Sequence, residues 1–252
     1  MRRTLLIVVA LAAIVAVEIV WLAPATLVGS RIEQASASAL RLADTEGTVW
    51  HARGMLVGGG ARLPIAWTLE LWPLLRGEAR LHIAPYAGTA KGPPRAAVRL
   101  HGNGFSVRDA EVVIPAPMLA ALAATPPSWM AGGDVDIAAA SFNWMPPAGS
   151  GEARIVWRAA RLTPPAASDA VALGDVTVAL TAFEDRVKGT IRNDGGDLDV
   201  QGDVSVRPGE GTLLSLVLVP RESASPALRG ALAAVGAGDG NGWRVEWRIP
   251  AR

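Results

Sequence analysis

The chain has 252 residues, and its 24 lysines and arginines nearly balance its 23 acidic residues, giving a formal net charge of +1 at pH 7. This balance provides no bulk electrostatic attraction to nucleic acid, so no nucleic-acid partner is expected. Cysteine is absent, which excludes a disulfide scaffold, a thiol nucleophile and a Cys-ligated zinc or iron–sulfur site.

An apolar segment near the N-terminus predicts a membrane anchor. Arg2 and Arg3 precede a run over residues 4–23 that is interrupted only by Glu18. About 20 residues of helix span about 30 Å, the thickness of a bilayer core. The positive-inside rule places the two arginines in the cytoplasm, and the indole of Trp21 suits the opposite headgroup region. We therefore expect a single-pass protein of the bacterial inner membrane with its C-terminal part in the periplasm.

Two points in this segment stay open. Ala23-Pro24-Ala25 is similar to a signal-peptide cleavage site. However, the apolar run exceeds the about 7–15 residues usual for a signal peptide, which favours a retained anchor over cleavage. Glu18 lies about one turn from the outer end of the helix, where its carboxylate either reaches the interface or contacts a partner's transmembrane helix.

The remainder of the chain alternates apolar and polar residues in the manner of β-strands. In residues 62–71 the odd positions are Leu63, Ile65, Trp67 and further leucines, and the even positions are mostly polar. This period of two is typical of a sheet with one apolar face. The same alternation recurs at residues 79–83, 153–157, 176–180, 198–200 and 243–249.

Only two soluble segments have the pattern of helices, and they mark an internal repeat. Residues 117–122 follow a strand that ends in Pro115, and residues 225–233 follow a strand that ends in Pro220. Ser225 and the proline after it are typical of a helix N-terminus. A third, amphipathic helix is possible within residues 31–42.

These patterns predict a mainly β fold. A single N-terminal transmembrane helix would lead to a curved, largely antiparallel β-sheet or open sandwich, built from two similar halves with two short helices. The expected divisions are a cytoplasmic N-terminus at 1–3, a transmembrane helix at 4–23, a membrane-proximal linker or short helix at 24–46, a first β half at 47–128 and a second at 129–252.

No catalytic or cofactor-binding motif occurs. The sequence contains no phosphate-binding loop, no His-Glu-x-x-His and no Gly-x-Ser-x-Gly. The three histidines are His51, His82 and His101, of which His82 and His101 fall on the polar positions of their strands, which favours solvated side chains. The aspartates at 194, 197 and 199 fit a solvated strand face better than a calcium loop, because their spacing matches no EF-hand. We therefore expect no cofactor, no metal site and no enzymatic activity.

Four tryptophans take inward, apolar strand positions: Trp67, Trp157, Trp243 and Trp247. Packing in a core is the first interpretation, and a tryptophan-lined groove for an apolar ligand is the second. In either case a sheet with one apolar face requires cover from its own loops, from lipid or from a partner.

The order of turns and strands along nearly the whole chain resembles a known family. The residues that carry the resemblance are Gly47 to Trp50, Arg53-Gly54, Trp67, Pro73 to Gly77, Gly151 to Trp157, Leu173-Gly174, Gly195-Gly196, Gly211 and Pro220-Arg221. This order resembles protein N of the bacterial type II secretion system. The resemblance implies a bitopic inner-membrane protein with a mainly β periplasmic part, an accessory role in export and no catalytic residues.

Two hypotheses follow. In the first, the chain supports export of folded proteins across the outer membrane through contacts with other secretion-system components, in the inner-membrane platform or the periplasm. In the second, it handles lipid or tethers envelope layers through an apolar β-groove, as AsmA-like proteins do. A sealed sandwich would favour the first, and an open groove with bound acyl chains the second. The candidate interaction residues are Gly47, Trp50, Trp67, Pro73, Gly77, Trp157, Gly195, Gly196, Trp243 and Trp247, and the candidate anchor residues are Arg2, Arg3, Glu18 and Trp21.

Overall fold

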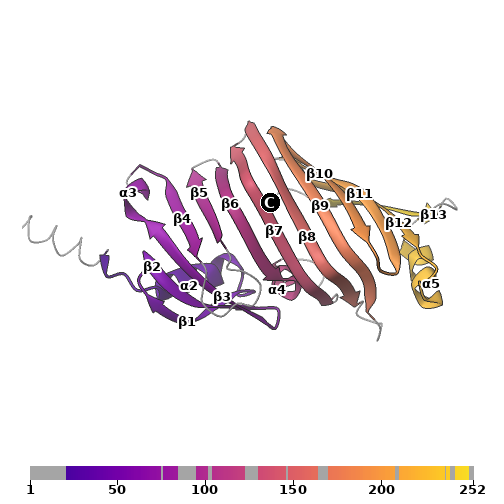
Figure 1. Cartoon of the computed structure of the whole chain (residues 1–252), viewed down its shortest axis with the longest axis horizontal. Coiled ribbons are helices and arrows are strands. Elements are labelled where there is room, and N and C mark those ends of the chain that lie inside the picture. The colour runs from indigo at the N-terminus through magenta and orange to yellow at the C-terminus, as the bar shows by residue number, and fades with distance from the viewer. Residues whose placement is uncertain are drawn as a thin grey trace, which may run out of the picture.

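A computed structural model describes residues 21–74, 76–84, 95–101, 104–122, 130–145, 147–163, 170–207, 210–235, 237–238 and 242–249. Within them the chain forms one fourteen-stranded antiparallel sheet (Figure 1). Each strand lies beside the next one in the chain, except that β14 lies between β12 and β13. The mainly β, antiparallel prediction is therefore confirmed, as an open single sheet.

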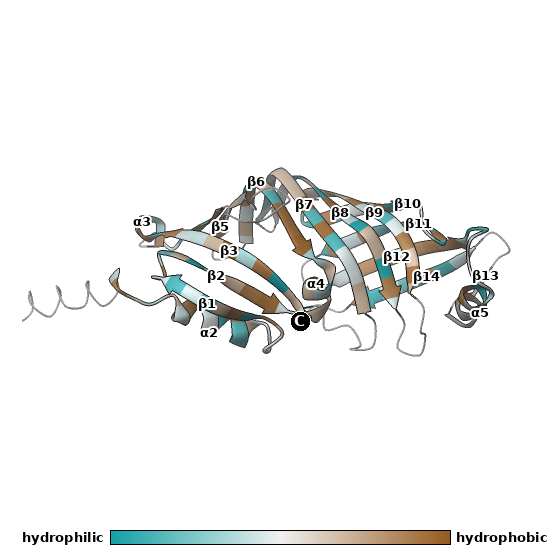
Figure 2. Ribbon diagram, turned by 60° about the horizontal axis from the view of Figure 1, so that its bottom comes forward, coloured by the Kyte–Doolittle hydropathy of each residue, from teal (hydrophilic) through white to brown (hydrophobic). Residues whose placement is uncertain are grey.

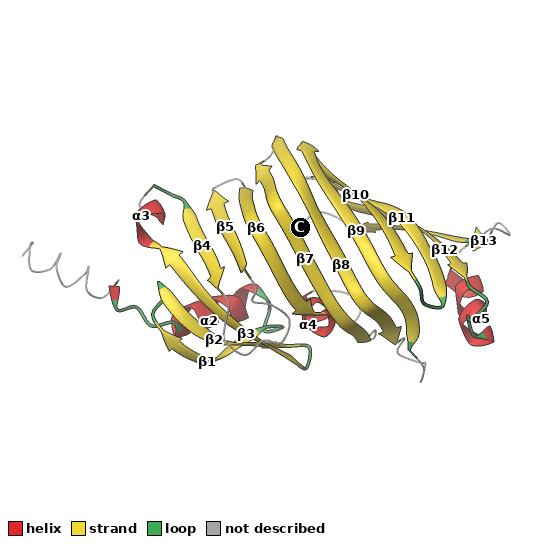
Figure 3. Cartoon of the chain, in the orientation of Figure 1, coloured by secondary structure: helices red, strands yellow, loops and turns green. Residues whose placement is uncertain are grey.

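The first six strands are β1 (Arg41–Gly47), β2 (His51–Gly58), β3 (Ala61–Glu70), β4 (Ala79–Ala84), β5 (Arg95–His101) and β6 (Gly104–Pro115). The others are β7 (Met130–Met145), β8 (Ala148–Thr163), β9 (Val171–Glu184), β10 (Arg186–Asp194), β11 (Leu198–Arg207), β12 (Gly211–Pro220), β13 (Ala237–Gly238) and β14 (Trp243–Ile249). The helices are α2 (Thr26–Ala35), α3 (Leu71–Leu74), α4 (Ala116–Leu122) and α5 (Pro226–Val235) (Figure 3).

Two of these helices confirm the predicted segments. Both α4 and α5 begin directly after or near a strand that ends in proline, and Ser225 Oγ accepts a hydrogen bond from the Leu228 amide at 3.2 Å, as an N-cap residue does. The expected helix at 31–42 is only partly correct, because α2 ends at Ala35 and a strand, β1, begins at Arg41. That strand lies before the expected start of the first β half.

The sheet is strongly arched. In Figure 2, α2, α4 and α5 lie on the inner side of the arch. The helix α4 follows β6, yet it packs against β2 as well as β7. Its Pro117 carbonyl comes so close to the β2–β3 turn that a Cβ on Gly59 would lie 2.0 Å from this oxygen. One short helix thus joins strands that are far apart in the sheet.

Bulges interrupt the ladders and contribute to this curvature. The register shifts between β1 and β2 near Asp44 and between β8 and β9 near Ala159, and both residues have positive φ angles, of 51° and 46°. An extra residue in one strand bends it and increases its twist. Further register shifts lie between β5 and β6 and between β7 and β8, so local insertions that contribute to the arch are spread along the sheet.

The anchor prediction lies almost entirely outside the described residues. Arg2, Arg3 and Glu18 belong to residues 1–20, of which nothing is described, and Trp21 is 61% exposed. Among the described residues, no helix combines the length and the apolar character that a membrane crossing requires.

Candidate interaction surface

The inner face of the arch is apolar across neighbouring strands. Residues that oppose each other in an antiparallel ladder lie on the same face, so the register defines continuous rows. One inner row contains Val107, Phe142, Gly151, Ala182, Val187 and Val206. Another inner row contains Val112, Ile137, Ile155, Val178, Ile191, Gly202 and Leu216.

The outer face carries the polar side chains. A row directly behind the first inner row contains Arg108, Ser141, Glu152, Thr181, Lys188 and Ser205. Ion pairs also lie on this side, including Arg158 with Asp136 and Arg80 with Glu70 at 3.6 Å. The alternation along each strand is visible in Figure 2. The sheet is thus two-faced, with its charge on the convex side and its apolar surface on the concave side.

Helices cover this apolar face at its two ends. At the N-terminal end, Ala25, Val28 and Ile32 of the α2 region pack on Leu42 and Trp67. At the C-terminal end, α5 contributes a second set of contacts. Its members are Leu228 and Leu232, which pack with Leu198, Val200, Leu218 and Trp243.

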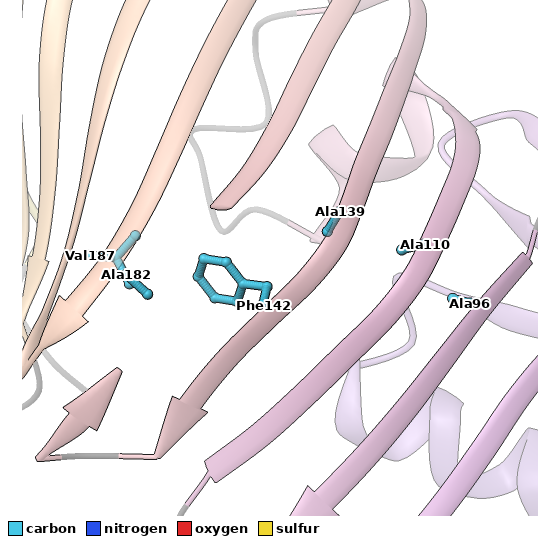
Figure 4. Packing of buried hydrophobic residues seen from close by; sticks show 6 residues of the cluster. All are labelled: Ala96, Ala110, Ala139, Phe142, Ala182 and Val187. Carbon is cyan, nitrogen blue, oxygen red and sulfur yellow. The ribbon is translucent and has the colours of Figure 1, made fainter. Parts of the chain in front are cut away.

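Between these ends, the central cluster is built from sheet residues alone. Its buried members are Ala96, Ala110, Ala139, Phe142, Ala182 and Val187 (Figure 4). The Phe142 ring stacks with that of Phe105 at a centroid separation of 6.2 Å, and Phe105, Val107 and Trp144 around them are only partly buried. On the same face Leu100 is 49% exposed. Helix α4 also lies on this inner side, where it packs against β7 and buries Met118. The described residues therefore form a trough that is covered at its ends and only partly covered along its middle.

The tryptophans take different roles on this face. Trp67 is 7% exposed, and its Nε1 donates a hydrogen bond to the Val49 carbonyl at 3.1 Å. Trp157 is half-buried and donates to the Gly132 carbonyl at 2.9 Å. Trp243 packs in the α5 cluster. Trp247 also lies on the inner face, but it does not pack in a core as expected. Its side chain is 55% exposed because its strand, β14, lies near the edge of the sheet.

The other candidate residues form turns. Gly47 ends β1 with a φ of 104°, and Trp50 lies half-buried between β1 and β2. Pro73 is buried in α3, a single helical turn between the paired strands β3 and β4, and its carbonyl accepts a hydrogen bond from the Arg76 amide. Gly77 follows with a φ of 78°. Gly195 and Gly196 form the β10–β11 turn, with φ angles of 79° and 78°.

Among the described residues, no three histidine, aspartate or glutamate side chains lie close enough together to bind a metal ion. His82 Nε2 lies 2.7 Å from Glu70 Oε1 on the outer face, and this hydrogen bond lowers the pKa of the Glu70 carboxyl. His51 is exposed, and the side chain of His101 lies outside the described part. Asp197 Oδ2 accepts a hydrogen bond from the Ala172 amide at 3.0 Å, so this carboxylate connects the β10–β11 turn to the start of β9.

The sequence patterns did not indicate the structural role of Asn193. Asn193 faces the inner side, and its amide nitrogen donates to the carbonyls of Leu173, Gly195 and Leu198 at 2.6 to 3.0 Å. Its Oδ1 accepts the Val200 amide at 2.7 Å. A lone asparagine at an apolar strand position, just before Gly195-Gly196, is the signal that could have indicated this role.

Neither the curated proteins nor the solved structures contain a match to the chain. A family model for type II secretion system protein N matches residues 38–245, a stretch that covers the sheet from before β1 into β14. The chain therefore belongs to the type II secretion system protein N family.

Proposed function

We propose that this chain is an inner-membrane accessory component of the type II secretion system, which supports export of folded proteins through contacts with other components. Family membership supports a place in this system. The apolar run at residues 4–23 behind Arg2 and Arg3 supports anchoring in the inner membrane, with the β-sheet in the periplasm.

The observation that carries a contact role is the open, apolar inner face. Soluble proteins rarely expose a continuous apolar surface unless something binds to it. Here the face extends over neighbouring central strands, with Val107, Phe105 and Trp144 only partly buried. On the opposite face, charged side chains such as Arg158 and Asp136 form surface ion pairs. The working surface is therefore the trough, and its task is binding.

Deletion of the gene tests this proposal. We expect less of a folded secreted protein in the medium and more of it in the periplasm. Variants with His51→Ala, His82→Ala or His101→Ala should restore export, because a contact protein needs no proton transfer or metal at these positions. Replacement of residues 1–23 by a cleavable signal should weaken export, since tethering raises the local concentration near membrane partners.

A second candidate function is lipid handling in the same trough. An open groove was expected to favour this function over a sealed sandwich, and the described residues form a single sheet whose inner face is partly open in its middle. An acyl chain can cover such apolar side chains without needing hydrogen-bond partners. In the deletion strain this function would produce an outer membrane that leaks detergents while export stays intact. That combination would refute the secretion proposal, and loss of export with an intact outer membrane would refute the lipid one.

A further inference from the structure

The last long strand of the sheet leaves one edge open. On one side β14 pairs with β12 from Trp243 to Ile249, but on the other side β13 reaches only Trp243 and Arg244. Among the described residues, nothing pairs with residues 245–249 on that side. Trp247 and Ile249 are each 55% exposed. An exposed, apolar strand edge of this kind is a template for a further strand.

The opposite edge of the sheet is protected. A bulge at Asp44 breaks the regular ladder of β1, and α2 packs against this strand. Bulges, charged residues and covering helices are the devices that prevent edge strands from pairing. Addition of β14 to the β1 edge of another copy is therefore disfavoured, and a closed pair formed by two β14 edges is the remaining symmetric arrangement.

The charges on β14 are free to contribute to such a pair. Arg244, Glu246 and Arg248 alternate on the outer face. Their partners across the β12 ladder are uncharged: Val217, Ser215 and Leu213. Within the described part of the chain, Glu246 and Arg248 take part in none of the ion pairs.

We propose that a second copy of this chain pairs antiparallel along β14, with Trp247 opposite Trp247 of the other copy. In this register Glu246 lies opposite Arg248, and Val245 lies opposite Ile249. The paired segment is residues 245–249, the part that β13 leaves free. Opposite charges and apolar pairs at facing positions stabilise antiparallel strands.

Other registers are excluded by the same residues. A pair centred on Glu246 would place Glu246 opposite itself and Arg244 opposite Arg248, so that like charges face each other. A pair centred on Val245 would match the charges, but it would need the edge at residues 243 and 244, which β13 occupies. A shift by one residue would place apolar side chains opposite charged ones on both faces.

The consequence is a continuous apolar surface. Because facing residues in a ladder share a side, pairing through β14 joins the inner face of one copy to that of the other. The exposed indole of Trp247 and side chain of Ile249 would then be covered by their counterparts.

Cysteine cross-linking of the full chain in native membranes tests this register. The chain has no cysteine of its own, so each introduced thiol is unique. Directly opposed strand residues have Cα separations that fit a disulfide. We expect Trp247→Cys to give a cross-linked species of twice the monomer mass under mild oxidation. Glu246→Cys mixed with Arg248→Cys should cross-link too, whereas Glu246→Cys alone should not. Arg41→Cys, exposed on the protected β1 edge, is the matched control and should stay monomeric.

Charge exchange provides a second, independent readout. In the Trp247→Cys background, Glu246→Arg or Arg248→Glu alone should lower the cross-linked fraction severalfold, and the two together should restore it. These exposed substitutions leave the sheet intact, which circular dichroism checks. Three results would each overturn the proposal. They are monomers in both cysteine experiments, cross-links to a different protein, and failure of the double exchange to restore the cross-linked fraction. Export in the deletion strain is a separate measurement, so this result stands or falls independently of the proposed function.

Discussion

Trp67→Ala should lower the free energy of unfolding by about 3–5 kcal/mol, the usual cost of removing a large aromatic side chain from a core. The side chain is 7% exposed and packs with Ala25 and Leu42, which ties the sheet to the α2 region. The substitution also leaves the Val49 carbonyl without the indole hydrogen bond at 3.1 Å. Urea denaturation followed by circular dichroism measures the change.

The neighbouring residue provides the control. Thr68 lies on the opposite, outer face, across from His82. Thr68→Ala should change stability by no more than about 0.5 kcal/mol, as surface substitutions usually do. Similar losses for Trp67→Ala and Thr68→Ala would show that the register of β3, and with it the assignment of the two faces, is wrong.

Two adjacent glycines should respond very differently to alanine. Gly195 and Gly196 both have a left-handed φ, so each alanine incurs a backbone cost of about 1–2 kcal/mol. A Cβ on Gly195 would meet only the Cα of Gly174, at 3.8 Å. A Cβ on Gly196 would lie 2.5 Å from the Leu173 carbonyl carbon and 2.6 Å from the Ala172 oxygen. Gly196→Ala should therefore cost about 1–3 kcal/mol more, because the backbone of the adjacent β9 has to move.

Thermal denaturation of the two variants, side by side, measures this difference. Gly195→Ala controls for backbone strain and for position in the turn. Equal losses would mean that the close approach of the β10–β11 turn to β9 does not exist in solution.

The period-two pattern predicted the strands well because it reports which side chains share a face. The segment around Trp67 shows this: Ile65 and Trp67, both expected to face inward, belong to the cluster that packs with the α2 region, and Trp67 lies opposite Ile83 in the ladder. The prediction of short helices at α4 and α5 also held, because proline before the first turn and a serine cap are local signals.

The sequence could not predict how far each inward position is buried. Burial depends on the arch, which arises from bulges such as the one at Ala159 and from contacts between distant segments, such as Pro117 against the β2–β3 turn. Trp67 and Trp247 have the same local pattern, but one lies under a helix and the other near an edge. The sequence also could not predict that β14 lies between β12 and β13, because strand order depends on long-range pairing.

The central claim is that the open inner face is the working surface in export. Leu100 and Leu213 form a matched pair, since both are leucines on strands, exposed to 49% and 43%. Leu100 faces inward opposite Phe105, and Leu213 faces outward opposite Ser205. In a deletion strain that produces equal amounts of either variant, the measured quantity is the fraction of a folded secreted protein that reaches the medium. We predict that Leu100→Glu strongly lowers this fraction while Leu213→Glu leaves it at the wild-type level; wild-type export by Leu100→Glu, or equal losses from both, would contradict the account.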